Sequence, residues 1–205
     1  MKVLIVNASP RRESNTKLAM AEMLKVFESE GIEPVVVEIG QEDVHGCIAC
    51  NACHRTGRCA FQDVVNETAP KFEEADGLLV MTPVYYASPN GTLVSFLDRL
   101  FYSTHFSKRM KVGAAFAAAR RGGLESTMDM LNKYFTISQM PVASSCYWNG
   151  IYGMAPGEAA QDAEGLRVAR TLAKNMSFLM KSIALGAKEY GLPENEPAAQ
   201  MNFIR

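Results

Sequence analysis

Near its start the chain reads Lys2-Val3-Leu4-Ile5-Val6-Asn7 and continues directly into Ala8-Ser9-Pro10-Arg11-Arg12-Glu13-Ser14-Asn15-Thr16. The apolar run is too short for a helix and is typical of a buried parallel strand. The loop after it places hydroxyls, backbone N–H groups and two arginines where a helix should begin. A helix N-terminus carries partial positive charge and unpaired N–H groups, which together bind phosphate. The candidate phosphate ligands are Ser9, Arg11, Ser14, Asn15 and Thr16.

The simpler interpretation of this loop is a helix N-cap made by Ser14 or Asn15 alone. Three hydroxyls and two arginines exceed what a cap requires, so we favour the phosphate site.

Strand candidates alternate with helix candidates along the whole chain. The expected strands are 3–7, 34–39, 77–81, 112–118 and 142–145, and the expected helices are 16–30, 64–74, 92–102, 124–138 and 162–190. Such alternation predicts an α/β fold of three layers, with a doubly wound five-stranded parallel sheet in the order 2-1-3-4-5. We expect one domain over residues 1–205, with a C-terminal arm at about 193–205 that contains two prolines.

Charge and composition narrow the classes of partner. The chain has 21 basic and 22 acidic residues, a net charge of −1, so we expect neither nucleic acid nor an electrostatically steered partner. Apolar stretches end before membrane-spanning length, and the N-terminus reads as a core strand rather than a secretory signal. With five cysteines and no export signal, we expect a reducing cytoplasm.

Three loops should meet beyond the carboxyl ends of the strands, where such sheets bind ligands. The second of them, after the strand at 77–81, has exposed aromatics and two prolines that suit a flat heteroaromatic ring. Its alternative role is a turn with tyrosines packed on the core. The third, after the strand at 112–118, offers glycines for close approach and arginines beside a ring that becomes anionic on reduction; the alternative for Arg120 or Arg121 is surface charge. The candidate ring contacts are Pro83, Val84, Tyr85, Tyr86, Ala87, Ser88, Ala118, Arg120, Gly122 and Gly123.

A phosphate and a planar ring together describe a mononucleotide. Neither the Gly-x-Gly-x-x-Gly fingerprint nor a Gly-Lys-Ser/Thr phosphate loop follows the first strand, which disfavours NAD, FAD and ATP as tightly bound groups. FMN fits best.

The run from Ala8 to Thr16 resembles the Gly-Ser-Pro-Arg…Ser-Asn-Thr signature of NAD(P)H-dependent FMN reductases. Asp76-Gly77, Pro83–Tyr86 and Asp98-Arg99 stand in the order and spacing of that family, over roughly residues 1–145. The resemblance implies a flavodoxin-like fold, FMN bound through the ligands named above, NAD(P)H as co-substrate, and a homodimer or homotetramer. Two positions differ from the pattern: Ala8 replaces the leading glycine, and Val94 replaces a lysine. We expect Asp98 and Arg99 to be structural.

A second signal is the cysteine segment, residues 46–59, in which Cys47, Cys50, Cys53 and Cys59 follow the spacing Cys-x2-Cys-x2-Cys-x5-Cys. Four thiolates so close in sequence can wrap one [4Fe–4S] cluster, and the motif resembles that of the iron–sulfur flavoproteins. The alternatives are half-buried thiols that hold no metal, a zinc site or a redox disulfide. We expect Cys146 to be a buried thiol and His54 to be solvated.

Residues 144–157 contain the single tryptophan, two tyrosines and three glycines. They suit either an aromatic lid over the flavin or a loop at a dimer interface.

The favoured hypothesis is an FMN-dependent oxidoreductase that passes electrons from NAD(P)H to a quinone, free flavin or other small acceptor, with no catalytic side chain because the flavin does the chemistry. The alternative is an iron–sulfur flavoprotein that takes electrons from a ferredoxin-like partner through a [4Fe–4S] cluster. A weaker third hypothesis is a zinc or interaction module that has lost its flavin.

Overall fold

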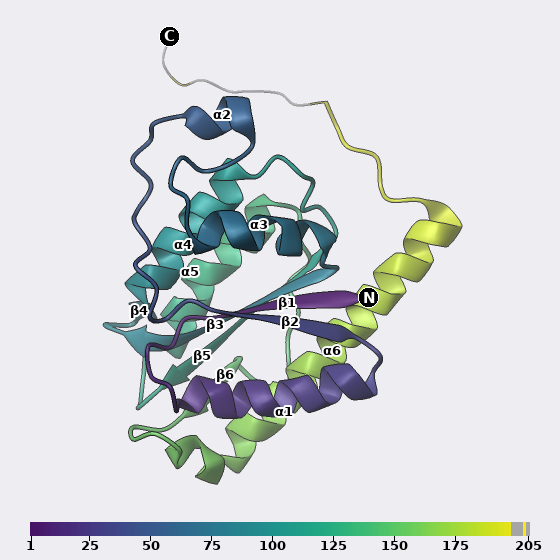
Figure 1. The fold of residues 1–205 in the computed structure, drawn as a ribbon. Coiled ribbons are helices and arrows are strands. Elements are labelled where there is room, and N and C mark those ends of the chain that lie inside the picture. The colour runs from purple at the N-terminus through teal and green to yellow at the C-terminus, as the bar shows by residue number, and fades with distance from the viewer. Residues whose placement is uncertain (198–202, 204–205) are drawn as a thin grey trace.

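A computed structural model describes residues 1–197 and residue 203 of the chain. Its central sheet joins five parallel strands in the order β2-β1-β3-β5-β6, as Figure 1 shows. This is the predicted order 2-1-3-4-5 once the short β4 is set aside, because β4 pairs only with β3, and antiparallel. The strands are β1 (Lys2–Asn7), β2 (Glu33–Glu38), β3 (Gly77–Tyr85), β4 (Ser88–Pro89), β5 (Val112–Ala119) and β6 (Gly150–Tyr152).

Helices cover both faces of this sheet and give the predicted three layers (Figure 1). The face below the sheet in this view carries α1 (Asn15–Ser29) and α6 (Ala163–Tyr190), and the opposite face carries α3 (Val64–Glu74), α4 (Gly91–Ser103) and α5 (Leu124–Ile137). A short helix α2 (Ala52–Thr56), which the sequence did not predict, and a 3-10 turn η1 (Glu158–Gln161) complete the elements.

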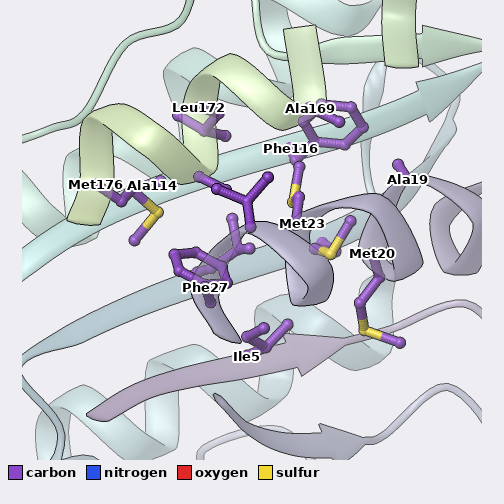
Figure 2. Close-up of a cluster of buried hydrophobic side chains, with 14 of the residues drawn as sticks. Ile5, Ala19, Met20, Met23, Phe27, Ala114, Phe116, Ala169, Leu172 and Met176 are labelled. Carbon is purple, nitrogen blue, oxygen red and sulfur yellow. The ribbon is translucent and has the colours of Figure 1, made fainter. Parts of the chain in front are cut away.

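The sheet separates two hydrophobic cores, and β1 contributes to both. Val3 and Ile5 face the α1–α6 layer, whereas Leu4 and Val6 face the layer of α3, α4 and α5. All four side chains are fully buried, which is why the strand reads as a continuous apolar run rather than an alternating one. Figure 2 shows part of the first core, with Phe27 of α1 lying between the sheet and α6.

The predicted fifth strand at 142–145 is wrong. Val142 makes only an isolated bridge with Gly113, and the fifth strand is β6, which pairs with Ala117–Ala119. At Gly113 the ring of Phe135 occupies the space beside the backbone, since a Cβ there would lie 2.5 Å from it. Gly150 has no side chain and fits against Leu124, where a Cβ would lie 2.7 Å from a methyl group. Both glycines thus allow α5 to pack closely on this side of the sheet, a tertiary contact that strand propensity does not indicate.

Strand β3 runs four residues beyond its predicted end and forms a hairpin with β4. The turn between them consists of Tyr86 and Ala87, both with positive φ (50° and 57°). A two-residue hairpin turn needs this backbone conformation, which residues other than glycine seldom adopt. The predicted stiff loop at 83–90 is therefore a hairpin that projects from the carboxyl edge of the sheet (Figure 1).

The expected C-terminal arm at about 193–205 lies only partly within the described residues. Residues 191–197 form neither helix nor strand, and residues 198–202 and 204–205 of the expected arm lie outside the described residues. Across the described part of the chain, no helix combines the length and the apolar character needed to cross a membrane.

One glycine fixes the path of the first loop. A Cβ at Gly40 would lie 2.1 Å from the carbonyl oxygen of Ser9 and 2.6 Å from the nitrogen of Pro10, so a side chain there must displace backbone. We expect Gly40→Ala to lower the free energy of unfolding by on the order of 1–3 kcal/mol.

The matched control is Gly186→Ala in α6, where a Cβ meets open space. It should raise stability by about 0.5–1 kcal/mol. Denaturant unfolding of both variants measures this, and equal stability of Gly40→Ala and the parent would contradict the close approach.

Candidate functional site

A pocket opens at the carboxyl edge of the sheet, where β1, β3, β5 and β6 end. Its volume is about 210 Å³, and we call it the edge pocket. Ten of the fifteen predicted cofactor contacts line it: Ser9, Arg11, Ser14, Asn15, Thr16, Pro83, Val84, Tyr85, Ala118 and Arg120. Three loops far apart in sequence therefore meet where the topology predicted.

The hydroxyl loop is ordered by its own side chains. Ser14 caps α1, since its Oγ accepts a hydrogen bond from the N–H of Lys17 (3.2 Å) and lies 2.8 Å from the Thr16 Oγ1. The Ser9 Oγ accepts from the N–H of Arg11 at 3.4 Å. The first turn of α1 contains no acidic residue, so its own side chains leave the positive end of this helix uncompensated. Ser14 therefore caps α1, as the simpler interpretation of the loop held. The cap does not fill the edge pocket, which still has room for an anion beside the helix N-terminus.

Two predicted phosphate ligands also hold a second segment in place. The side chain of Asn15 donates to the carbonyl of Ala155 (3.2 Å) and accepts from the N–H of Ala159 (3.2 Å). The Arg11 guanidinium donates to the carbonyl of Met154 at 3.2 Å. The residues after β6 are thereby fastened to the start of α1.

This fastened segment supplies the two pocket residues that were not among the predicted contacts, Gly153 and Met154. Gly153 follows the carboxyl end of β6 directly, and a Cβ there would lie 2.6 Å from the Asn15 side chain. The available signal was the rule that ligands bind at strand ends. It pointed to the wrong residues because the fifth strand was expected eight residues too early.

Five predicted ring contacts lie outside the edge pocket: Tyr86, Ala87, Ser88, Gly122 and Gly123. Tyr86 is fully exposed at the hairpin turn. Gly123 (φ 91°) packs against Ala87, where a Cβ would lie 2.8 Å from its Cα, and Ser126 donates to the Ala87 carbonyl at 2.7 Å. Ala87 is thus held against the start of α5, and contact of these five residues with a bound ring stays a prediction.

The aromatic pair of the 144–157 segment also lies outside the pocket lining. Tyr147 and Trp148 pack edge to face with ring centroids 5.0 Å apart, and both are exposed. Cys146 is exposed rather than buried, and its Sγ lies 3.8 Å from the Thr171 hydroxyl. The expectation of a buried thiol is wrong because residues 144–149 cross the surface instead of continuing a fifth strand.

The four cysteines of the 46–59 segment line one narrow cavity, which we call the cysteine pocket. Its open volume is about 20 Å³, and Phe61, Arg99 and Ser103 also line it. Cys53 is buried, Cys59 is half-buried, and Cys47 and Cys50 are exposed; all are free thiols. The segment lies over α3 and α4, at the top of the view in Figure 1.

Asn66 of α3 fixes the end of this segment. Its side-chain oxygen accepts from the N–H of Cys59 (3.0 Å), and its amide nitrogen donates to the carbonyls of Cys59 (2.9 Å) and Phe61 (2.8 Å). Positive φ angles at Ala49, Asn51 and Gly57 bend the chain between the cysteines. The end of the segment is therefore held to α3 by hydrogen bonds between the Asn66 side chain and the backbone of Cys59 and Phe61.

A buried guanidinium supports the cysteine pocket from below. Arg99 is 1% exposed and forms a bidentate pair with Asp63, the N-cap of α3, at 2.6 and 2.9 Å. Its Nε donates to the Cys59 Sγ at 3.1 Å. Its Nη1, which also donates to Asp63, donates to the His45 carbonyl at 3.1 Å. The expected structural pair of Asp98 and Arg99 is therefore wrong, because Arg99 pairs with Asp63 and not with the adjacent Asp98.

Asp98 accepts a hydrogen bond from the Tyr134 hydroxyl instead. Burial, followed by the hydrogen bond to Asp98, raises the pKa of Tyr134. His54 is exposed as expected, and its Nε2 lies 2.9 Å from the Tyr102 hydroxyl.

The cysteine pocket fits an iron–sulfur cluster in donor chemistry, because such clusters take four thiolates. Among the residues that the structure describes, no three His, Cys, Asp or Glu side chains converge tightly enough for a single metal ion. The exposed Cys47 and Cys50 line the same cavity as the buried Cys53 and the half-buried Cys59.

The turn that carries Gly153 and Met154 depends on one carboxylate. Glu158 accepts from the N–H groups of Ala155 (3.0 Å) and Met154 (2.7 Å), and these hydrogen bonds lower its pKa from the ordinary 4.5. The lowered pKa means that this stabilisation is present above pH 4.5 and is lost as the pH falls below it.

We expect Glu158→Gln at neutral pH to reproduce that loss. Amide hydrogen exchange at residues 153–155 should quicken severalfold while the midpoint of global unfolding changes little. The matched control is Glu13→Gln, an exposed glutamate in the neighbouring loop. Unchanged exchange in Glu158→Gln would show that the turn is held by other contacts.

The chain matches known proteins over most of its length. The family model described as NADPH-dependent FMN reductase matches residues 1–155. An iron–sulfur flavoprotein of Methanocaldococcus jannaschii is 36% identical over 191 residues, covering 89% of this chain and 99% of that protein. Among solved structures, an archaeal flavodoxin has a TM-score of 0.56 at 19% identity, covering 86% of this chain and 99% of that one.

An NAD(P)H:quinone oxidoreductase from Methanothermobacter marburgensis has a TM-score of 0.67 at 18% identity, covering 86% of this chain and 96% of that one. At these identities the two solved structures confirm the flavodoxin-like fold alone. The family match extends through β6 to the turn that closes the edge pocket, and the 36% identical relative is matched over almost its whole length. The chain therefore belongs to the NADPH-dependent FMN reductase family of flavodoxin-like flavoproteins.

Proposed function

We propose that the edge pocket binds FMN and that the protein is an oxidoreductase that passes electrons from NAD(P)H to a second acceptor. The observation that carries this proposal is the arrangement of Ser9, Ser14 and Thr16 around the uncompensated N-terminus of α1. Hydroxyls and helix N–H groups donate hydrogen bonds to a phosphate, and the helix dipole favours its negative charge.

The size of the edge pocket suggests how the cofactor is presented. Pockets that bury most of a ligand usually enclose about 300–1,000 Å³, whereas this one measures about 210 Å³. It suits the phosphate end and one edge of the ring, beside Pro83–Tyr85, with the remainder of the ring open to a substrate. Flavin supplies the hydride and electron chemistry when it is bound, so the protein needs no acid–base side chain.

Arg120 is the pocket residue best suited to tune such a group. It lines the pocket beside Ala118 and Ala119, whose small side chains allow close approach. A fixed cation there stabilises negative charge on a reduced ring. Arg121 is exposed outside the pocket lining and matches the surface-charge alternative.

A second candidate function is supported by the cysteine pocket. The protein would be an iron–sulfur flavoprotein, in which Cys47, Cys50, Cys53 and Cys59 hold a [4Fe–4S] cluster and a ferredoxin-like protein supplies electrons. The relative from M. jannaschii bears that name, and the exposure of Cys47 and Cys50 leaves this site open to a protein partner. The intact edge pocket argues against a module that has lost its flavin. A homodimer or homotetramer and a cytoplasmic location remain predictions.

The phosphate assignment is tested by Ser14→Ala combined with Thr16→Ala. A hydrogen bond to a charged group contributes about 1.5–3 kcal/mol, so loss of two should weaken FMN binding on the order of a hundredfold or more. Fluorescence titration of flavin-depleted protein with FMN measures this. Because Ser14 is also a cap, the double variant should lose about 1 kcal/mol of stability.

The matched control removes two hydroxyls at the far end of α5, with Thr136→Ala and Ser138→Ala, and should bind FMN as the parent does. Unchanged FMN affinity in the Ser14/Thr16 variant would place the phosphate elsewhere.

The two candidate functions are separated by the visible spectrum, iron and sulfide content, and NAD(P)H oxidation of protein purified without oxygen. Flavin bands without iron, together with rapid NAD(P)H oxidation by a quinone or free flavin, would identify a reductase whose cysteines are structural. Flavin bands on broad iron–sulfur absorption, with about four irons per chain and no NAD(P)H turnover, would identify the electron carrier. Absence of flavin in both the purified and the FMN-supplemented protein would contradict the whole proposal.

A further inference from the structure

Helix α4 lines the cysteine pocket with the exposed Tyr102 and with two buried polar side chains, Arg99 and Ser103. They are four residues apart, which places them one above the other on the same helix face. Both are almost fully buried, at 1% and 3% exposed. Apolar residues are the usual choice at such positions, so two adjacent hydrogen-bond donors here require an explanation.

The Ser103 hydroxyl is unsatisfied. Its Oγ is buried and has no hydrogen-bond partner among the described residues. Buried hydroxyls are nearly always paired, because burial without a partner costs the hydration of the group. A serine on a helix commonly donates to the carbonyl four residues earlier, as Thr104 does to Leu100 at 2.6 Å, but Ser103 makes no such contact. Its proton remains available to a group in the cysteine pocket.

Arg99 is oriented toward the same pocket. Its terminal nitrogens are used by Asp63 and the His45 carbonyl, and its Nε already donates to the Cys59 sulfur at 3.1 Å. The Phe61 ring lies against the guanidinium, 4.9 Å from its central carbon. Because the ion pair with Asp63 holds the guanidinium in place, the Nε–H of Arg99 stays directed at the Cys59 sulfur.

We propose that Arg99 and Ser103 are positioning residues for the redox group of the cysteine pocket, donating hydrogen bonds to its sulfur atoms and raising its reduction potential. The inference rests on the proposed iron–sulfur function. Hydrogen bonds to sulfur and charge near the site are among the factors that set the potentials of iron–sulfur clusters. A donor stabilises the reduced form more, because reduction adds negative charge.

Ser103 is the better residue to test, since Arg99 also anchors the fold through Asp63. Ser103→Ala removes only the hydroxyl. The matched control is Ser95→Ala, two turns earlier on α4 and outside the lining of the cysteine pocket. Full-length protein, purified or reconstituted without oxygen, is assayed for iron and sulfide and titrated electrochemically with EPR detection of the cluster.

With iron content equal to the parent, Ser103→Ala should have a more negative cluster potential. The reduced-to-oxidised ratio at the parent midpoint should fall about tenfold, which is about 59 mV for a one-electron couple. Ser95→Ala should keep the parent potential, and the flavin potential should not change in either variant.

An unchanged potential in a fully loaded Ser103→Ala protein would overturn this inference and leave the cluster proposal standing. Loss of iron from Ser103→Ala alone would also overturn it, in favour of a purely structural role. A parent protein without iron after reconstitution would overturn the cluster proposal itself, and the inference with it, without affecting FMN binding at the edge pocket.

Discussion

All strands of the main sheet run in the same direction, and this constraint organises the molecule. Parallel strands end at one edge, so the loops after β1, β3, β5 and β6 meet there although they are separated by as much as two thirds of the chain. Helix α1 starts at this edge and brings its positive end with it. The edge pocket is the direct result, because side chains from these loops surround a helix terminus that lacks an acidic partner.

The edge pocket is closed by polar contacts between segments that are distant in sequence. Asn15 and Arg11 hold residues 154–159, and Glu158 orders the turn within that segment. Side chains that resemble phosphate ligands in sequence therefore also build the pocket wall. Substitution of Asn15 or Arg11 would change the shape of the pocket as well as its charge, whereas Ser14 and Thr16 lack contacts to the closing segment among the described hydrogen bonds.

The cysteine segment depends on a different interaction, the pair between the buried Arg99 and the partly exposed Asp63. Breaking a buried pair by removing one partner typically costs about 3–5 kcal/mol, although replacing both with apolar residues is often neutral. Stability alone thus gives little reason for a guanidinium at this position. A chemical reason is that Arg99 donates a hydrogen bond to the Cys59 sulfur. The hydroxyl of Ser103, which is buried nearby on the same helix, has no partner of its own among the described residues. The fold consequently carries two sites on one scaffold, with the first at the sheet edge and the second over α3 and α4.

The sequence alone determined the layers, the strand order and most of the edge pocket, because these follow from local patterns. Continuous apolar runs identify buried parallel strands, and the hydroxyl loop at 8–16 is contiguous with the helix that it starts. Tertiary packing decided the rest. The fifth strand is residues 150–152 and not 142–145. Its first residue, Gly150, has low strand propensity and fits against Leu124 of α5, which local sequence does not reveal, and this choice brings Gly153 and Met154 into the pocket. The partner of Arg99 is Asp63, 36 residues away, since a buried charge pairs with whatever the fold places beside it, and sequence neighbours such as Asp98 point elsewhere on a helix.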